Sequence, residues 1–341
     1  MSSTSRGSCR STAASRYKWR FISRTHLSYI ISITALLVFF AYIYRNAHRY
    51  LGLLDFSLDS LSLLVGLVLV VMLSNGSINY LLYRGLKVRL SFQEGIGLAT
   101  INTLANQLPF AGGMIAKGVY LKQRHRLAYT HFLSATVALY ILFVTGNGLV
   151  GIASFAFLKF VQGIALPNWL IFGFLGMIAS ISLLRVPMNT ALLRGRWGKR
   201  IEQLLVGKQL FCQNQLLAGE LVTIQILSTI ALAGRFWIAF HLLSQDVTLA
   251  QCILFASASI LTQLITITPG GLGIRELIVA SIASLLGVDV GISVLAIGLD
   301  RVIATPIVAA VGSICVYHLS GKLRSSRVAP TSAEQPQEHT T

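Results

Sequence analysis

Long apolar runs, separated by short polar segments, recur along the whole chain. Runs of roughly 17 to 25 predominantly apolar residues are long enough to cross a bilayer as helices. Six runs reach this length, at residues 27–44, 61–83, 130–158, 168–186, 220–243 and 292–319. The pattern therefore predicts an all-α, polytopic integral membrane protein with about six full transmembrane helices.

Two further apolar segments are interrupted by proline and glycine. Pro109 precedes Gly112 and Gly113, and Pro269 is followed by three glycines, Gly270, Gly271 and Gly273. Proline removes a backbone donor and glycine weakens helix, so a helix is expected to stop at each break. Backbone opened in this way survives in hydrocarbon only where protein or a polar cavity covers it. The breaks indicate interrupted helices that line a site, and tight turns at a membrane surface are the alternative.

The basic residues around the first break predict a re-entrant hairpin. Lys and Arg are abundant both before residue 95 and after residue 116, and such residues favour the cytoplasmic side. Because both flanks are cytoplasmic, segment 95–109 cannot be one full crossing. It is expected to enter and leave from the cytoplasm, although an amphipathic surface helix would also fit.

The second break predicts a hairpin from the opposite side. Residues 249–268 lead into it, and 277–287 lead away over a stretch too short to cross alone. The order of span, hairpin and span thus occurs twice with opposite orientation. We expect an inverted repeat, in which the second and third spans correspond to the fifth and sixth.

Composition and charge agree with a membrane protein. Apolar residues make up 54% of the chain and charged residues 11%, yet the net charge is +17. The Lys and Arg lie in short loops and tails, as the positive-inside rule requires, so no nucleic-acid partner is implied. We expect one transmembrane domain over 27–319, disordered cytoplasmic tails at 1–26 and 320–341, and a multi-pass protein of the plasma (inner) membrane with both termini cytoplasmic.

A few ionisable residues lie inside the apolar segments. They are Arg235, Arg275, Glu276, Asp300 and Arg301. A charge at the membrane centre costs roughly 2.5 to 3.5 kcal/mol on insertion scales, so these residues must face partners, water or ligand. Asp300 and Arg301 are about 100° apart on a helix, so other elements must supply their partners. The net charge of +1 favours an anionic headgroup, because arginine binds phosphate bidentately; purely structural ion pairs are the alternative.

No catalytic, metal or cofactor constellation is evident. The seven histidines fall in tails or near the ends of spans, and no phosphate-binding glycine loop ends in lysine. We expect no enzyme activity, no metal and no cofactor. A lipid-linked transferase with Glu276 or Asp300 as base is a weaker hypothesis, and so is a membrane subunit of a separately encoded lipid- or glycan-modifying enzyme.

Two motifs carry a resemblance to a known family. Asn106-Gln107-Leu108-Pro109 with Gly112-Gly113 and Lys117, and later Pro269-Gly270-Gly271-Leu272-Gly273-Ile274-Arg275-Glu276, resemble the flippase-like transmembrane domain of the lysylphosphatidylglycerol synthase family. The resemblance covers nearly the whole membrane part. It implies a flippase-like protein that moves an anionic or zwitterionic phospholipid or lipid-linked headgroup between leaflets, and it adds Lys117 and Asn106 to the substrate-binding residues. Because no synthase domain follows the last span, a stand-alone member is expected.

Overall fold

The structure is a computed structural model that describes residues 58–106, 112–182, 211, 213–263 and 273–328. Within these ranges the regular structure is entirely helical, with no strand. The all-α class predicted from the sequence is therefore confirmed. The expected first span at 27–44 and both expected tails, apart from 320–328, lie outside the described residues.

Four helices are long and apolar enough to cross a membrane. They are α2 (Leu58–Gly85), α5 (Tyr129–Ala156, continued by a π-helical turn at Phe157–Val161), α9 (Gln215–His241) and α12 (Val290–Val328). These helices coincide with the second, third, fifth and sixth predicted spans. The chain is a multi-pass membrane protein.

The remaining helices are short. They are α3 (Phe92–Ala105), α4 (Gly112–His125), α6 (Trp169–Ala179), α10 (Leu249–Ser259, extended by a 3-10 turn at Ile260–Gln263) and α11 (Ile274–Leu285). Helix α6 lies in the predicted fourth span, 168–186, whose last residues fall outside the described ranges. The segment 95–109, which was expected to enter and leave as a hairpin by itself, is mostly one helix, α3, and its partner α4 occupies the basic stretch that was expected to be a cytoplasmic flank. The second predicted hairpin corresponds to α10 with α11.

The helices that open the two hairpins are capped in the same way. The Ser91 side chain accepts a hydrogen bond from the Glu94 backbone, and the Glu94 carboxylate accepts one from the Ser91 backbone. Thr248 and Gln251 form the same reciprocal pair at the start of α10. Each pair satisfies two backbone donors that a helix N-terminus otherwise leaves open. The sequence therefore fixes where both helices begin.

The turns before these caps also match. Lys87 has φ 61° and Ser244 has φ 53°, and each lies four residues before its cap. In the first turn the Lys87 N–H donates to the Arg84 carbonyl and the Val88 N–H to the Tyr83 carbonyl. The second turn has the same two bonds, from Ser244 to His241 and from Gln245 to Phe240. Both turns are Schellman motifs, in which glycine usually takes the left-handed position.

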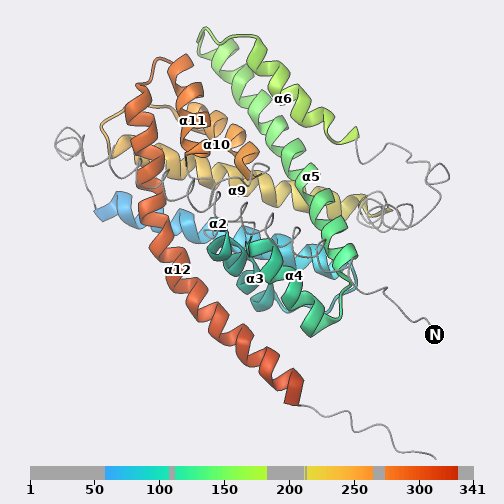
Figure 1. The fold of residues 1–341 in the computed structure, drawn as a ribbon. Coiled ribbons are helices and arrows are strands. Elements are labelled where there is room, and N and C mark those ends of the chain that lie inside the picture. The colour runs from blue at the N-terminus through green and yellow to red at the C-terminus, as the bar shows by residue number, and fades with distance from the viewer. Residues whose placement is uncertain (1–57, 107–111, 183–210, 212, 264–272, 329–341) are drawn as a thin grey trace, which may run out of the picture.

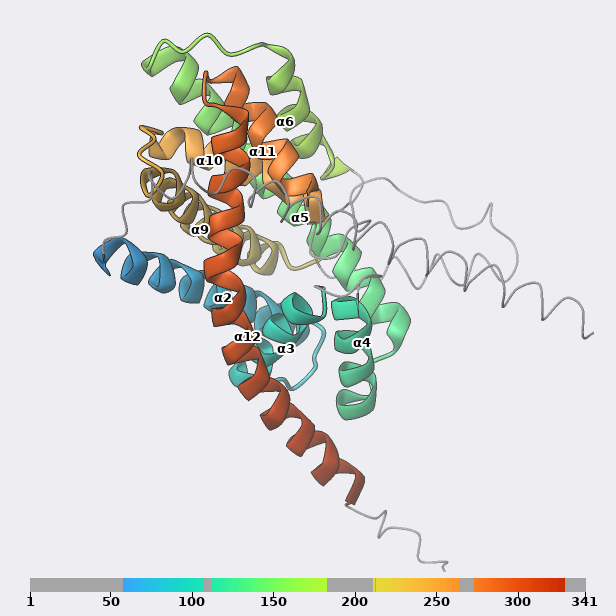
Figure 2. The same cartoon turned by 60° about the vertical axis from the view of Figure 1, so that its left-hand side comes forward.

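The packing of α2–α5 is repeated by α9–α12. Helix α2 packs on α3 and α9 packs on α10, α3 pairs with α4 and α10 with α11, and α5 contacts α10 as α12 contacts α3. The most extensive contact between two helices, that of α2 with α9, joins the two sets. In both views the pair α3 and α4 lies at the opposite end of the molecule from the pair α10 and α11 (Figures 1 and 2).

Close approach of α2 and α3 depends on two glycines. A Cβ atom added to Gly76 would lie 2.5 Å from Ile96 Cγ1 and 2.9 Å from Ile96 Cα, and one added to Gly95 would lie 2.8 Å from the Gly76 carbonyl oxygen. Because one contact at each position is with backbone, a side chain there forces the helices apart. Small residues allow membrane helices to pack this closely.

We predict that Gly76→Ala destabilises the protein by about 1 to 3 kcal/mol, the usual cost of overpacking. Gly66→Ala, in the same helix, is the matched control because a Cβ atom there meets nothing within 4 Å. Thermal unfolding of the purified variants in detergent measures the difference. Equal unfolding temperatures for the two variants would show that the α2–α3 contact is looser than described.

Candidate functional site

Five buried charged residues from three helices form one cluster. Arg235 lies near the end of α9, Arg275 and Glu276 lie in the first turn of α11, and Asp300 and Arg301 lie within α12. These are the five residues that the sequence placed inside the membrane. The structure brings all of them together, although they are up to 66 positions apart in the chain.

Asp300 is the centre of the cluster. Its side chain is 0% exposed, and its two oxygens accept hydrogen bonds from Arg235 Nε at 2.8 Å and Arg235 Nη2 at 3.0 Å. Arg275 Nη2 lies 3.5 Å from the second carboxylate oxygen. The pair with Arg235 is bidentate, which is the strongest geometry for an arginine and a carboxylate. One carboxylate thus joins α9, α11 and α12.

Glu276 holds the start of α11. Its Oε2 accepts a hydrogen bond from the Gly273 backbone N–H at 2.8 Å, and its Oε1 lies 2.9 Å from Arg301 Nε. Gly273 has φ 83°, a left-handed conformation that glycine adopts without steric cost. The carboxylate therefore ties the glycine-rich break to α12. Asp300 and Arg301 obtain their partners from other helices, as the sequence predicted.

Arg275 is the least satisfied cation of the cluster. Its guanidinium lies over the Phe236 ring, 4.8 Å from the centroid, and its weak bond to Asp300 uses only Nη2. Arg275 Nε is buried and has no hydrogen-bond partner among the described residues. The side chain retains 17% exposure. Since the five residues sum to +1 and Arg235 is already bidentate, Arg275 has the donors left for an anion.

A second buried cation lies in the other half. The Lys117 ammonium, on α4, donates to Asn79 Oδ1 on α2 and lies 5.4 Å from the centroid of the Tyr83 ring. Asn79 comes twelve residues before the cap Ser91, and Phe236 comes twelve residues before the cap Thr248. Each hairpin thus brings a cation from its second helix to the same level of the preceding long helix. Asn79 is itself buried, at 5% exposure.

Asn106 binds within its own hairpin. Its Oδ1 accepts a hydrogen bond from the Gly113 N–H at 3.2 Å, across the break between α3 and α4. A Cβ atom on Gly113 would lie 2.2 Å from the Asn102 carbonyl oxygen, so only glycine fits there. Gly112 begins α4. The other predicted break residues, Pro109, Pro269, Gly270 and Gly271, lie outside the described residues, and substrate binding by Asn106 and Lys117 stays a prediction.

Sequence reasoning missed Glu94. This carboxylate is 5% exposed, binds the Ser91 backbone and hydroxyl, and accepts a hydrogen bond from the Tyr120 hydroxyl at 3.1 Å. It links α4 to the start of α3. Glu276 similarly links the first turn of α11 to Gly273, at the end of the glycine-rich break. The Ser-x-x-Glu spacing was the signal that could have revealed it, because this is the capping-box pattern.

A polar contact between α5 and α9 was also missed. The Thr229 hydroxyl donates to Asn147 Oδ1 at 2.9 Å, and the Asn147 amide donates to the Phe143 carbonyl. Such bonds hold membrane helices together.

Among the residues that the structure describes, no three His, Cys, Asp or Glu side chains gather closely enough to hold a metal ion.

Comparison with known proteins gives one match. Residues 26–312 match the family described as lysylphosphatidylglycerol synthase TM region. The match includes both hairpins and all five residues of the charge cluster. No curated protein and no solved structure matches the chain.

We predict that Asp300→Asn destabilises the fold strongly. The change leaves Arg235 and Arg275 without their shared anion, and breaking a buried ion pair costs about 3 to 5 kcal/mol. Asp289→Asn is the control, because Asp289 is exposed and asparagine can still accept the hydrogen bond from the Ile292 N–H. Thermal unfolding in detergent compares them. An Asp300→Asn protein as stable as the control would mean that the cluster contributes little to folding.

Proposed function

We propose that this chain, which belongs to the lysylphosphatidylglycerol synthase TM region family, is a lipid flippase. It would move a phospholipid or a lipid-linked headgroup between leaflets. The observation that carries the proposal is the spare hydrogen-bonding capacity of Arg275 inside the buried charge cluster. A phosphate accepts the bidentate bonds that an arginine guanidinium offers. The preferred cargo is an anionic or zwitterionic headgroup.

The repeated packing supports alternating access. Helices α3 and α4 have 14 residues each, or roughly 21 Å of helix, which is shorter than the hydrocarbon core of a bilayer at about 30 Å. Helix α10 has 11 residues and continues for four more as a 3-10 turn, and α11 has 12 residues, so both are also too short to cross alone. We interpret each pair as a re-entrant hairpin, and the matched caps and turns as an inverted repeat. Transporters with this design bind substrate at the interface of the repeats near the midplane.

The contacts of α3 favour a hairpin over a surface helix. Helix α3 packs against α2, α4 and α12, and a helix lying in the headgroup region would leave a whole polar face in water. Its counterpart α10 packs among α5, α9 and α11. With the spans expected from the sequence at 27–44 and 168–186 added to the four long helices, we propose six spans and two hairpins for the domain.

The surroundings of the cluster suit a lipid. Leu277 and Val302 directly follow Glu276 and Arg301 in sequence, and both are exposed. Apolar side chains on the outer surface would contact hydrocarbon, while the adjacent charged residues face the interior. A headgroup could therefore meet Arg275 while its acyl chains stay in the membrane. A water-soluble substrate would instead require a water-filled path through the protein.

We predict a topology with both termini cytoplasmic, in a plasma (inner) membrane. Outside-reactive thiol probes on intact cells should label single cysteines introduced near Asp246 and Asp289, and should not label those near Lys122 or Arg196. Membrane-permeant probes applied to the same variants provide the control for reactivity. Labelling at Lys122 from outside would contradict the inverted repeat.

We predict that Arg275→Lys lowers transport appreciably, because lysine keeps the charge and loses the bidentate fork. Arg275→Ala and Glu276→Ala should nearly abolish it, since each leaves buried partners unpaired. The measurement is leaflet exchange of labelled phospholipids in proteoliposomes that contain pure protein. Arg124→Lys, at an exposed position on α4, is the matched control.

Two outcomes would contradict the flippase proposal. If folded wild-type protein leaves exchange of every tested phospholipid and polyprenyl-phosphate lipid at the rate of empty liposomes, a membrane subunit of a separate enzyme becomes the better hypothesis. Turnover of a lipid substrate in detergent would instead favour a lipid-linked transferase. An Arg275→Lys variant that transports at the wild-type rate would exclude the bidentate role.

A further inference from the structure

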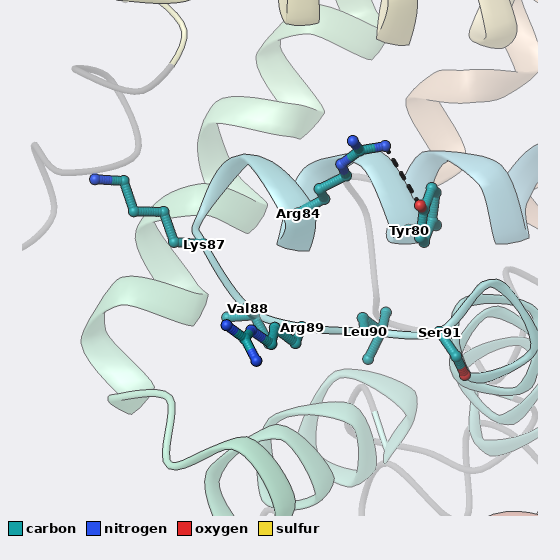
Figure 3. Close-up of a pocket in the computed structure, with 7 residues that line it drawn as sticks. All are labelled: Tyr80, Arg84, Lys87, Val88, Arg89, Leu90 and Ser91. Atoms are coloured by element: carbon teal, nitrogen blue, oxygen red, sulfur yellow. Dashed lines mark hydrogen bonds between the residues drawn. The ribbon is translucent and has the colours of Figure 1, made fainter.

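A hollow of about 480 Å³ lies where α2 ends and α3 begins. Three cations line it, Arg84, Lys87 and Arg89, together with Tyr80 and Ser91. Figure 3 shows Arg84 lying back along α2 toward Tyr80, while the side chains of Lys87 and Arg89 extend from the turn itself. The hollow is separate from the charge cluster of α9, α11 and α12.

The positive charge of this hollow is not neutralised within the described part of the chain. No acidic residue lines it, and none of the three cations makes an ion pair there. Arg84 donates a hydrogen bond of 3.4 Å to the Tyr80 hydroxyl, and its guanidinium lies 5.9 Å from the centroid of the Tyr80 ring. The nearby carboxylate of Glu94 is buried and is used by Ser91 and Tyr120. The hollow therefore presents three exposed cations to a ligand.

The backbone at Lys87 is the second observation. Lys87 occupies the left-handed position of its Schellman turn at φ 61°, where glycine is the preferred residue. The matching turn before α10 has Ser244 in this position, with the same hydrogen bonds. The backbone is thus left-handed in both halves, but this position carries a long cationic side chain only in the first half.

The third observation is an aromatic pair beside the hollow. Tyr80 and Phe92 meet edge to face, with ring centroids 5.9 Å apart, and Phe92 is 45% exposed. Tyrosine is enriched where membrane helices pass the level of the lipid headgroups. A ligand that combines a negative charge with an apolar body fits the neighbouring cations and rings.

We propose that this hollow binds the phosphate of an anionic phospholipid from the cytoplasmic leaflet. The proposal rests on the topology given under the proposed function, in which the α2–α3 turn faces the cytoplasm. The side chains of Arg84, Lys87 and Arg89 point in different directions in Figure 3, but all three are exposed and can turn toward the phosphate. The acyl chains extend past Phe92 along the outer surface of the protein. The site is distinct from the transport site at Arg275.

Lipid retention by the full-length protein tests this site. Protein purified in detergent is titrated with dioleoyl phosphatidylglycerol or with dioleoyl phosphatidylcholine, and bound lipids are counted by native mass spectrometry. We expect Lys87→Gly to weaken phosphatidylglycerol binding about fivefold, as expected for one basic residue near a membrane surface. Arg89→Gln should have a similar effect. Glycine suits the left-handed turn, so the unfolding temperature of Lys87→Gly should be unchanged or higher.

Ser244→Gly is the matched control, because it alters the equivalent turn of the other half and removes no charge. It should leave phosphatidylglycerol binding unchanged. Unaltered binding by Lys87→Gly, or an equal loss of both lipids, would overturn the proposal. Displacement of phosphatidylglycerol by inorganic phosphate at equal concentration would assign the hollow to a soluble anion and would also overturn it. Because binding is measured at equilibrium, failure of the transport proposal would not alter these outcomes.

Discussion

The ion pairs of Asp300 are the contact on which the rest of the candidate site depends. A carboxylate with no exposure is stable in a low-dielectric interior only when its charge is met by well-placed donors. Arg235 supplies two of these donors from α9, and Arg275 supplies a weaker one from α11. One side chain of α12 thereby determines how three helices meet. It also orients Arg275, whose remaining donors are the basis of the proposed phosphate recognition.

The two halves of the molecule share one scaffold but carry different charged residues on it. Each half has a long helix, a Schellman turn, a capping box, a pair of short helices and a second long helix. In one half the buried cation is Lys117, which is bound to Asn79. In the other half it is Arg275, within a network of five charges. The turns differ in charge as well, since Lys87 stands where the other half has Ser244.

The sequence predicted the class, four of the long helices, the interruptions between α3 and α4 and between α10 and α11, and the five residues of the charge cluster. These features depend on apolar length, on proline and glycine, and on the cost of burying charge, all of which are local properties. It could not predict which carboxylate pairs with which arginine, because that depends on how α9, α11 and α12 approach one another. The left-handed backbone of Lys87 was also hidden, since nothing in its neighbours marks a lysine for a position that glycine prefers. Glu94 was missed although its capping-box spacing was visible.

The most direct test of headgroup recognition at Arg275 is whether exchange between leaflets depends on the phosphate of the lipid. Proteoliposomes with the wild-type protein would be loaded with a labelled phospholipid or with a neutral glycolipid that has the same acyl chains and label. Recognition of phosphate by Arg275 predicts that only the phospholipid exchanges faster than in empty liposomes, and that Arg275→Ala removes the difference. Equal acceleration of both lipids by wild-type and Arg275→Ala protein would contradict it.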